Sequence, residues 1–515
     1  MSNIYDRGVV ILDFGSQYTQ LIARRVRELN VYSFILPPET SIDKILSLNP
    51  GALILSGGPS SIYDQNAPDF DQKILDIDLP ILGICYGLHL LTHYNGGKVS
   101  STGSGEYGFA NINIFETENL FESIKSPAVW MSHGDQVTKV PKDWEVLAES
   151  SNGIIAAMMN KSRSLVATQF HPEVHHTKDG LKMLENFLLK IADCQPNWTA
   201  GNFIKEQTEK IRNFVGDGSV LTGVSGGVDS TVVAALLHKA IGSRSHAVII
   251  DHGLMRKNEV SECVDALADG LGVNIHAYDE SKIFLSKLKG IVDPEKKRKI
   301  IGNQFIYSFD RIAMSLGKIE FLAQGTLYPD KIESGVSKGN TSHVIKSHHN
   351  VGGLPENMEF KLVEPLDELF KDEVRKVGKE LGLPSKLINR HPFPGPGLGV
   401  RIIGEITQER INILQEADRI YMDILLEDNI YDKIWQAFSV LIPVKTVGVM
   451  GDQRTYENLL AIRAVNSTDG MTADWFDMPS ETLSKISRRI VNSVRGINRV
   501  VYDITSKPPG TIEWE

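Results

Sequence analysis

The chain has 515 residues, of which 42% are hydrophobic and 23% are charged, as in an ordinary globular protein with about three domains. This composition excludes wholesale disorder, and the net charge of −10 argues against nucleic-acid and anionic-membrane partners. The three cysteines, an odd number without Cys-x-x-Cys spacing, exclude a disulfide scaffold and favour a reducing compartment.

The first part of the chain alternates short apolar runs with amphipathic stretches, a pattern typical of a mainly parallel sheet with helices on both faces. We predict strands over residues 9–12, 31–36, 52–55 and 80–84, and helices over residues 17–29 and from Tyr86 onward. Shorter strands with turns are expected between residues 110 and 170, followed by a closing helix over residues 181–191. The polar segment 193–202, which contains Pro and Gly, is predicted to be a linker.

A second alternating pattern begins near residue 220 and predicts another parallel α/β domain. Its expected strands are 220–224, 247–250, 273–277 and 322–325, with helices at 229–241 and 259–271. The alternating prolines of residues 391–397 exclude a helix there. Beyond them we expect helices at 407–428 and 481–494, and strands at 446–449, 461–465 and 500–503.

The sequence therefore predicts two doubly wound, mainly parallel α/β domains followed by a smaller α+β domain. We place the three domains at residues 1–198, 199–390 and 391–515. The sequence shows no secretory signal and no apolar run near the ~18 residues of a membrane span. We therefore expect a cytoplasmic protein without a membrane partner.

A glycine-framed cysteine is the first candidate site. Cys85 has a glycine two residues away on each side and lies where an apolar strand gives way to an apolar helix, as a nucleophile at a strand-to-helix turn does. The N-terminus of that helix favours a thiolate, and the amide of Tyr86 would face a developing oxyanion. The flexible segment 56–60 could supply the second oxyanion donor, at Gly58.

A histidine and a glutamate supply the other parts of this site. In extended backbone His171 and Glu173 point to the same side, so that the carboxylate can orient or support the imidazole as a base for Cys85. A lone cysteine after a strand is more often part of the core, and a lone histidine is more often structural. The combination of the framed cysteine with the His-x-Glu pair favours a catalytic triad.

The second candidate site is a turn rich in glycine and serine that follows the predicted strand 220–224 and opens a helix. Its residues are Ser225, Gly226, Gly227, Val228, Asp229, Ser230 and Thr231. Such a turn lets amides and hydroxyls approach phosphate oxygens, and Asp229 can help to hold Mg²⁺. The alternative is a serine-rich helix cap without a ligand. A reader of the γ-phosphate is not supported, because the sequence has no Gly-x-x-x-x-Gly-Lys-Ser/Thr motif.

Three other segments are less specific. Residues 103–108 fit Gly-x-Gly-x-x-Gly but do not open a helix, so we predict a hairpin turn instead of a dinucleotide site. The basic run 295–299 is expected to be a solvated helix face rather than a phosphate site. The histidine-rich segment 343–349 lacks an acid or thiol that would complete a metal site, and we interpret it as a mobile lid with Lys346 near the phosphates.

The first part of the chain, residues 8–190, resembles the class I glutamine amidotransferases. The matching segments are Ser56-Gly57-Gly58-Pro59, Gly83-Ile84-Cys85-Tyr86-Gly87, Ser132-His133-Gly134-Asp135 and His171-Pro172-Glu173. This resemblance implies glutamine hydrolysis through a γ-glutamyl thioester, with release of ammonia. The turn at 225–230 resembles the PP-loop of ATP pyrophosphatases, which implies cleavage of ATP between its α and β phosphates.

Nearly the whole chain resembles the glutamine-hydrolysing GMP synthetase family. The segments that carry this likeness are 131–135, 225–230, 253–259, 324–330, 346–355, 391–398 and the tail 505–515. The resemblance implies that XMP, ATP and glutamine give GMP, AMP, pyrophosphate and glutamate through an adenylated XMP. It also implies Mg²⁺ with ATP, no organic prosthetic group, and a homodimer formed by the C-terminal domain.

The family's XMP site maps onto Arg256, Lys507, Ile512 and Glu513. The two basic residues suit a nucleotide phosphate, and Glu513 suits a base or amine N–H. Two alternatives stay open: a PP-loop RNA-modifying enzyme with a fused glutaminase, and a ligand-sensing amidotransferase homologue without activity. The acidic net charge and missing Cys-x-x-Cys disfavour the first, and the intact triad disfavours the second.

Overall fold

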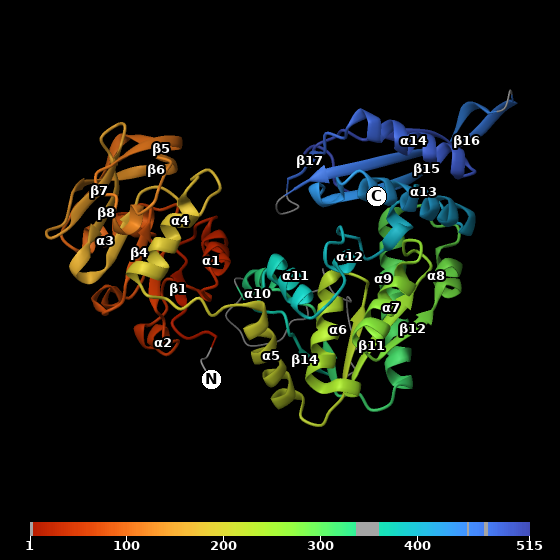
Figure 1. Cartoon of the computed structure of the whole chain (residues 1–515), viewed down its shortest axis with the longest axis horizontal. Helices are drawn as coiled ribbons and strands as arrows, with labels where there is room; N and C mark the ends of the chain where they lie inside the picture. The colour runs from red at the N-terminus through yellow and green to blue at the C-terminus, as the bar shows by residue number, and fades with distance from the viewer. Residues whose placement is uncertain (1–3, 336–359, 451–452, 468–471) are drawn as a thin grey trace. The chain divides into compact units, whose positions relative to one another are not determined.

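The computed structural model describes residues 4–335, 360–450, 453–467 and 472–515 (Figure 1). The chain divides into two compact units, Met1–Glu206 and Gln207–Glu515. The boundaries of the three predicted domains stay predictions. Within the described part of the chain, no helix combines the length and the apolar character that crossing a bilayer requires.

A nine-stranded sheet forms the first unit, in the order β2-β1-β3-β4-β9-β8-β7-β5-β6. Strands β2, β1, β3, β4 and β9 are parallel, and the others continue the sheet in antiparallel pairs. The strands are β1 (Val9–Leu12), β2 (Ser33–Leu36), β3 (Ala52–Leu55), β4 (Ile81–Ile84), β5 (Lys98–Ile114), β6 (Ala128–Lys139), β7 (Glu145–Ser150), β8 (Ile155–Asn160) and β9 (Leu165–Thr168). Strands β1, β3 and β4 are buried on both faces, which explains their continuous apolar runs.

Helices connect these strands, so the predicted parallel α/β arrangement is confirmed. They are α1 (Thr19–Glu28), α2 (Ile42–Leu46), α3 (Tyr86–Tyr94) and α4 (Gly180–Glu185), the last continued by a π-helical segment over Asn186–Ile191. Helix α1 buries Ile22, Ala23 and Val26, which its helical spacing places on one side. A further helix, α5 (Ala200–Val215), begins inside the segment predicted to be a linker.

The hairpin turn predicted at residues 103–108 is wrong, because these residues lie inside strand β5. The pairing of β5 with β6 shifts register between Ser101 and Glu106, so the strand accommodates extra residues without reversing direction. Gly108 has a positive φ of 97° within the strand. Here the glycine-rich stretch marks an irregular long strand instead of a turn.

The second unit contains a parallel sheet in the order β12-β11-β10-β13-β14, so its predicted α/β part is confirmed. The strands are β10 (Val220–Val224), β11 (Ser245–Asp251), β12 (Ile275–Asp279), β13 (Phe321–Ala323) and β14 (Lys361–Val363). The helices are α6 (Val228–Ile241), α7 (Glu259–Leu271), α8 (Ser281–Leu288), α9 (Pro294–Ser315), α10 (Tyr328–Gly335), α11 (Lys371–Glu380) and α12 (Ser385–Ile388). Strand β10 is the central strand, and the predicted phosphate-binding turn follows it.

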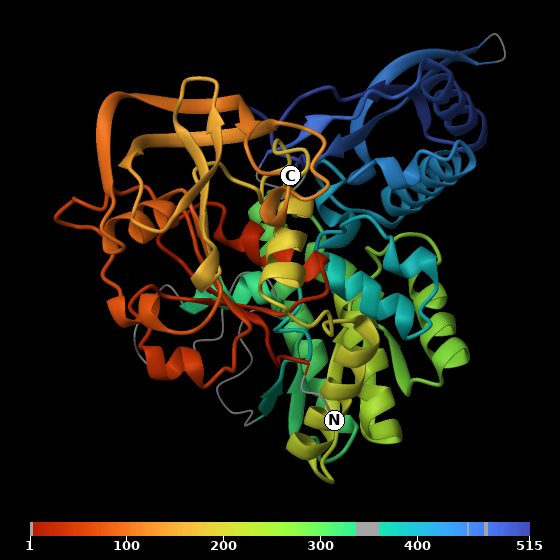
Figure 2. The same ribbon diagram turned by 60° about the vertical axis from the view of Figure 1, so that its left-hand side comes forward.

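The C-terminal part of the second unit mixes helices and strands, as predicted. Its strands are β15 (Gln436–Met450), β16 (Gln453–Asn466), β17 (Asp474–Trp475) and β18 (Ile497–Tyr502), and its helices are α13 (Gln408–Glu427) and α14 (Ser480–Ser493). Figures 1 and 2 show the hairpin of β15 and β16 extending past both helices. Leu441 and Ile462 on one face of this hairpin belong to the same buried cluster as Leu221 and Val248 of the parallel sheet. One core therefore runs through both sheets of this unit.

The chain's last residues cover the opposite face of the β15–β16 hairpin. The apolar contacts there join Ile512 to the buried residues Phe438, Val440 and Ala461. From the same face the completely buried guanidinium of Arg463 pairs with Asp503 at 2.8 Å. Arg463 also donates hydrogen bonds of 2.8, 3.1 and 2.9 Å to the carbonyl oxygens of Thr505, Thr511 and Ile512. One buried cation thus fixes the course of the tail.

The basic run 295–299 was predicted to be a solvated helix face, and this is wrong for Lys297. The side chain of Lys297 is completely buried in α9, where it pairs with Glu515 and donates to the carbonyl oxygen of Ile402 at 2.7 Å. Glu295 and Lys299 are exposed, as expected. A buried ammonium group needs an acidic partner. The partner of Lys297 is more than 200 residues away in the sequence, so the local pattern does not indicate that Lys297 is buried.

Arg463→Met should destabilise the second unit by about 3 kcal/mol or more, because Asp503 and three tail carbonyls would lose a buried partner. The urea midpoint of the unfolding transition of this unit measures the change. Arg454→Met, on an exposed position of the same strand, is the control and should change the free energy of unfolding by less than about 0.5 kcal/mol, which leaves the midpoint nearly unchanged. Equal urea midpoints for the two variants would contradict the conclusion that Arg463 holds the tail on the hairpin.

Candidate active sites

A sharp turn after strand β4 holds Cys85 at the start of helix α3. Cys85 has a φ of 52° and a ψ of −97°, a strained conformation for a residue with a side chain. A methyl group on Gly83 would lie 2.5 Å from the carbonyl oxygen of Gly87, and one on Gly87 would lie 2.4 Å from that of Leu55. Both glycines are therefore needed for the helix to start this close to the sheet.

His171 and Glu173 follow strand β9, which pairs with β4. The Nδ1–H of His171 donates to Oε1 of Glu173 at 2.7 Å, and both side chains are buried. Burial lowers the pKa of His171, but the Glu173 carboxylate and the Cys85 sulfur outweigh it and raise the pKa to about 10. A methyl group on Gly57 would lie 3.2 Å from the His171 ring and 3.8 Å from Cβ of Cys85. The structure thus brings the three residues of the predicted triad together.

The two predicted oxyanion donors lie beside this triad. The amide of Tyr86 begins helix α3, and Gly58 follows β3, the neighbour of β4. A methyl group on Gly58 would lie 2.7 Å from the carbonyl oxygen of Phe14, so this position also requires glycine. Within the described residues neither amide has a hydrogen-bond acceptor, which leaves both available to a ligand. Their role in binding an oxyanion stays a prediction.

Other polar groups around the sulfur received no role from the sequence. The side-chain amide of Gln169 lies 3.8 Å from Sγ of Cys85, and the carbonyl oxygen of Ser132 lies 3.7 Å from it. Beside Ser132, the buried His133 faces Glu106 across the β5–β6 ladder at 3.5 Å, and burial lowers the pKa of His133. The sequence places Gln169 two residues before the triad histidine, on the same side of an extended chain. No pattern in the sequence indicates that Glu106 lies beside His133, because its position depends on the pairing register of β5 and β6.

The turn after strand β10 has the form of an anion-binding loop. Gly226 has a φ of 75°, and a methyl group on it would lie 2.7 Å from Nη1 of Arg390. Helix α6 then begins at the buried Val228. Three hydroxyls line the turn, those of Ser225, Ser230 and Thr231. The two serine oxygens are 3.2 Å apart, and the threonine hydroxyl donates to the carbonyl oxygen of Gly227 at 2.8 Å. The predicted phosphate ligands thus gather at one helix N-terminus.

Asp229 stands in the first turn of α6 with its two carboxylate oxygens in different settings. Oδ2 pairs with the ammonium of Lys371, whereas Oδ1 is buried without a hydrogen-bond partner among the described residues. Gly325, after β13, approaches closely, since a methyl group on it would lie 3.3 Å from Cβ of Asp229. Mg²⁺ bound with nucleotide phosphates takes one or two carboxylates, so the unpaired oxygen fits such an ion.

Arg256, one of the predicted XMP ligands, is partly buried and already paired. Its Nε lies 3.0 Å from Oδ2 of Asp418. Its guanidinium lies 5.2 Å from the ring centre of Phe393, and those of Arg390 and Arg401 lie 5.3 and 5.0 Å from the same ring. Each of these guanidinium groups also pairs with a carboxylate, those of Asp418, Glu259 and Glu513, so the positive charges around the ring are balanced.

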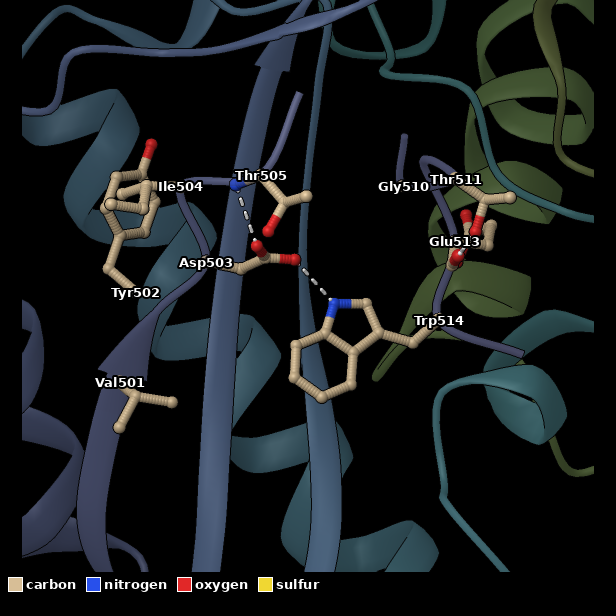
Figure 3. Close-up of a pocket in the computed structure, with 9 residues that line it drawn as sticks. All are labelled: Val501, Tyr502, Asp503, Ile504, Thr505, Gly510, Thr511, Glu513 and Trp514. Atoms are coloured by element: carbon tan, nitrogen blue, oxygen red, sulfur yellow. Dashed lines mark hydrogen bonds between the residues drawn. The ribbon is translucent and has the colours of Figure 1, made fainter. Parts of the chain in front are cut away.

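Glu513, another predicted XMP ligand, accepts two hydrogen bonds from Arg401, at 3.1 and 2.8 Å, and one from Gln436 at 2.9 Å. It lines a cavity of about 520 Å³ formed by residues 501–505, 510, 511, 513 and 514. Figure 3 shows the ring of Trp514 reaching across to Asp503, to which Nε1 donates at 2.9 Å. This geometry fixes the Glu513 carboxylate at the cavity wall.

Two further residues of the predicted XMP site, Lys507 and Ile512, do not line this cavity. Lys507 forms a strand-like bridge with Ala473 through backbone hydrogen bonds of 2.7 and 3.1 Å, and Ile512 packs on the hairpin. The predicted lid with Lys346 and its histidines lies outside the described residues. The assignment of these side chains to XMP stays a prediction.

The chain matches known protein families along its length. Residues 10–191 match the family "Glutamine amidotransferase class-I", residues 200–304 match "NAD synthase", and residues 423–514 match "GMP synthase C terminal domain". The protein named "GMP synthase [glutamine-hydrolyzing]" of Brachyspira hyodysenteriae is 53% identical over 100% of both chains. Relatives with the same name have 54% identity in Thermosipho melanesiensis, over 98% of this chain and 99% of theirs, and 53% in Aquifex aeolicus, over 99% of both. The chain belongs to the family of glutamine-hydrolyzing GMP synthases.

Proposed function

We propose that this enzyme makes GMP by moving the amide nitrogen of glutamine to XMP, with ATP cleaved to AMP and pyrophosphate. The full-length identity to glutamine-hydrolyzing GMP synthases supports this reaction. One observation supports the assignment of the two half-reactions to different units. A buried Cys-His-Glu triad lies in the first unit, and the anion-binding turn lies in the second. The first unit would release ammonia, and the second would prime the acceptor.

In the glutaminase reaction, the sulfur of Cys85 attacks the side-chain carbonyl carbon of glutamine. The imidazolium of His171 and the N-terminus of α3 both stabilise negative charge on the sulfur. The amides of Gly58 and Tyr86 hold the developing oxyanion, and His171 gives a proton to the departing nitrogen. Ammonia leaves, and water then hydrolyses the γ-glutamyl thioester to glutamate. Glu173 holds the ring and its charge in place.

In the synthetase reaction, the turn at residues 225–231 binds the phosphates of ATP at the N-terminus of α6. The 2-oxygen of XMP attacks the α-phosphorus, and pyrophosphate leaves. Ammonia then attacks C2 of the adenylated purine, and AMP departs. Arg256, Lys507, Ile512 and Glu513 are the proposed XMP residues.

Mg²⁺, when bound with ATP, would neutralise phosphate charge, and Asp229 is the residue that would hold it through Oδ1. Lys371, paired with the other oxygen, keeps this carboxylate oriented toward the turn. No organic prosthetic group is needed for either half-reaction.

We also propose a cytoplasmic homodimer. Three buried free thiols suit a reducing compartment. The β15–β16 hairpin exposes Val444, Val447, Val449 and Tyr456, an apolar surface of the kind that a second copy covers. The alternative of an RNA-modifying enzyme is disfavoured, because relatives that match the whole chain carry the name of a GMP synthase.

Cys85→Ala should reduce glutamine-dependent GMP formation by roughly 10⁴-fold, because the nucleophile is lost. GMP formation from added ammonium salts should persist, since the second unit does not use the thiol. Product formation with each nitrogen donor is the measurement. Cys194→Ala, which removes another buried thiol of the same unit, is the control and should keep both activities. Equal loss with both donors in the Cys85 variant would argue against two separate chemistries.

The charge on His171 predicts a pH dependence of stability. Its pKa is raised from 6.5 to about 10 in the folded chain, so the stabilisation is complete below about pH 6.5 and is lost as the pH rises toward 10. Glu173→Gln removes the carboxylate that raises this pKa, and the loss should then occur at lower pH. The melting temperature of the first unit, measured from pH 6 to pH 10, tests this.

The control for this pH series is Glu39→Gln, an exposed carboxylate of the same unit, which should leave the profile unchanged. A profile for Glu173→Gln that superimposes on the parent chain would show that His171 is not held charged.

Asp229→Asn should reduce XMP-dependent pyrophosphate release by about a hundredfold, because the carboxylate oxygen that fits the metal becomes an amide. Glutamine hydrolysis should remain. Asp265→Asn, on an exposed position of α7, is the matched control. Normal ATP turnover in the Asp229 variant would count against the assignment of the turn.

A further inference from the structure

A buried side-chain amide joins the triad cysteine to a second histidine. Gln169, immediately after β9, is fully buried, and its Nε2 lies 3.8 Å from Sγ of Cys85. Its Oε1 lies 3.1 Å from Nε2 of His89, which is also buried. His89 lies in the first turn of α3, four residues after Cys85, which immediately precedes the helix. The three groups form a chain from imidazole to amide to sulfur.

The two ends of a carboxamide have opposite effects on a neighbouring anion. If the NH₂ end faces the sulfur, it donates to the negative charge; if the oxygen faces the sulfur, it repels that charge. The orientation therefore depends on what the far end of the amide contacts. A donor N–H on Nε2 of His89 fixes the oxygen of Gln169 toward His89 and the NH₂ toward the sulfur. Burial lowers the pKa of His89 to about 4, so the ring is neutral and carries one N–H, which the inference places on Nε2.

We infer that Gln169 donates a hydrogen bond to the anionic sulfur of Cys85 and that His89 is the positioning residue that fixes the amide in this orientation. The inference rests on the proposed role of Cys85 as nucleophile. It adds a donor to the sulfur besides the triad histidine. A hydrogen bond to a charged acceptor is among the stronger ones in proteins.

Other polar groups near this chain have partners of their own. The carbonyl oxygen of Asp135 accepts from Nδ1 of His133 at 2.9 Å and is also a hydrogen-bond acceptor for the His89 ring, so it competes with Gln169 for the single N–H of that ring. His133 also faces Glu106 at 3.5 Å, and His171 is held by Glu173 at 2.7 Å. The sulfur itself lies near the carbonyl oxygen of Ser132, which repels an anion. A donor such as the Gln169 amide offsets that repulsion.

The first test is the rate at which iodoacetamide alkylates Cys85 near pH 7, followed by mass spectrometry of the labelled peptide. Cys194 and Cys263 serve as internal references, because burial raises their pKa values to about 12 and about 11 and keeps them unreactive. Gln169→Met keeps the side-chain length and removes the donor. It should slow alkylation of Cys85 by about tenfold. An unchanged rate would overturn the inference.

The second test separates positioning from packing at His89. His89→Leu removes the donor to Gln169 and should slow alkylation about as much as Gln169→Met does. His89→Gln restores an N–H donor and should return the rate to within about twofold of the parent chain. A His89→Leu variant with the parent rate, or a His89→Gln variant as slow as His89→Leu, would refute the positioning role.

Glutamine kinetics supply a third readout. In Gln169→Met and His89→Leu, kcat for glutamine hydrolysis should fall about tenfold while KM changes by less than about twofold, since the amide acts on the sulfur. A raised KM with unchanged kcat would assign these residues to glutamine binding and overturn the inference.

Thr92→Val is the matched control, because it removes another buried hydrogen-bonding group from α3, one that donates only within the helix at 2.8 Å. It should keep the alkylation rate even if it lowers the melting temperature. The chemical readout does not depend on GMP synthesis. If Cys85→Ala retained glutamine hydrolysis, the proposed function would fail, whereas the alkylation rates would still decide the role of Gln169.

Discussion

A strand that ends in a tight turn into a helix underlies both candidate sites. In a parallel sheet the strands' carboxyl ends and the helices' N-termini meet at one edge, so backbone amides and a positive helix end point at the same place. In the first unit this edge holds Cys85 with a φ of 52°, and in the second it holds Gly226 with a φ of 75°. One arrangement stabilises a sulfur anion and the other suits phosphates. The chemistry differs through the side chains on the turn and those that neighbouring segments bring to it, such as His171 in the first unit and Lys371 in the second.

The two units use buried charge for different purposes. Around Cys85 the charged groups belong to the proposed reaction, and His171 keeps its proton because Glu173 accepts its hydrogen bond at 2.7 Å. In the second unit the buried cations Arg463 and Lys297 are structural, since they bind the tail that carries the proposed XMP residues. Because the tail has few apolar residues, apolar burial alone holds it weakly against the sheet. The ion pairs and hydrogen bonds of the buried cations provide the remaining stabilisation.

The sequence predicts features that depend on local spacing and misses those that depend on strand register or distant partners. The turn at Cys85, the His171–Glu173 pair, the turn at residues 225–231 and helix α7 each follow from residues within a few positions of one another, and the structure has each of them where expected. The approach of His171 to Cys85 depends on the pairing of β4 with β9. The solvated position predicted for Lys297 is wrong because its partner Glu515 is remote in the chain. Residues 103–108 read as a turn because glycine marks both turns and irregular strands. Gln169 and His89 come together only because α3 packs beside β9.

The sequence of the second unit shows an α/β pattern followed by an α+β pattern, yet the unit has one core. The segment 390–401 links these two parts. At one end Arg390 donates to the carbonyl oxygen of Gly226 in the phosphate-binding turn at 2.7 Å, and at the other end Arg401 binds Glu513 of the tail. Phe393 lies between them under both guanidinium groups. Because adenylation requires ATP and its acceptor to meet, a rigid link between the two binding regions is an advantage. The ammonia-producing unit has a separate core, which is compatible with chemistry that needs only glutamine and water.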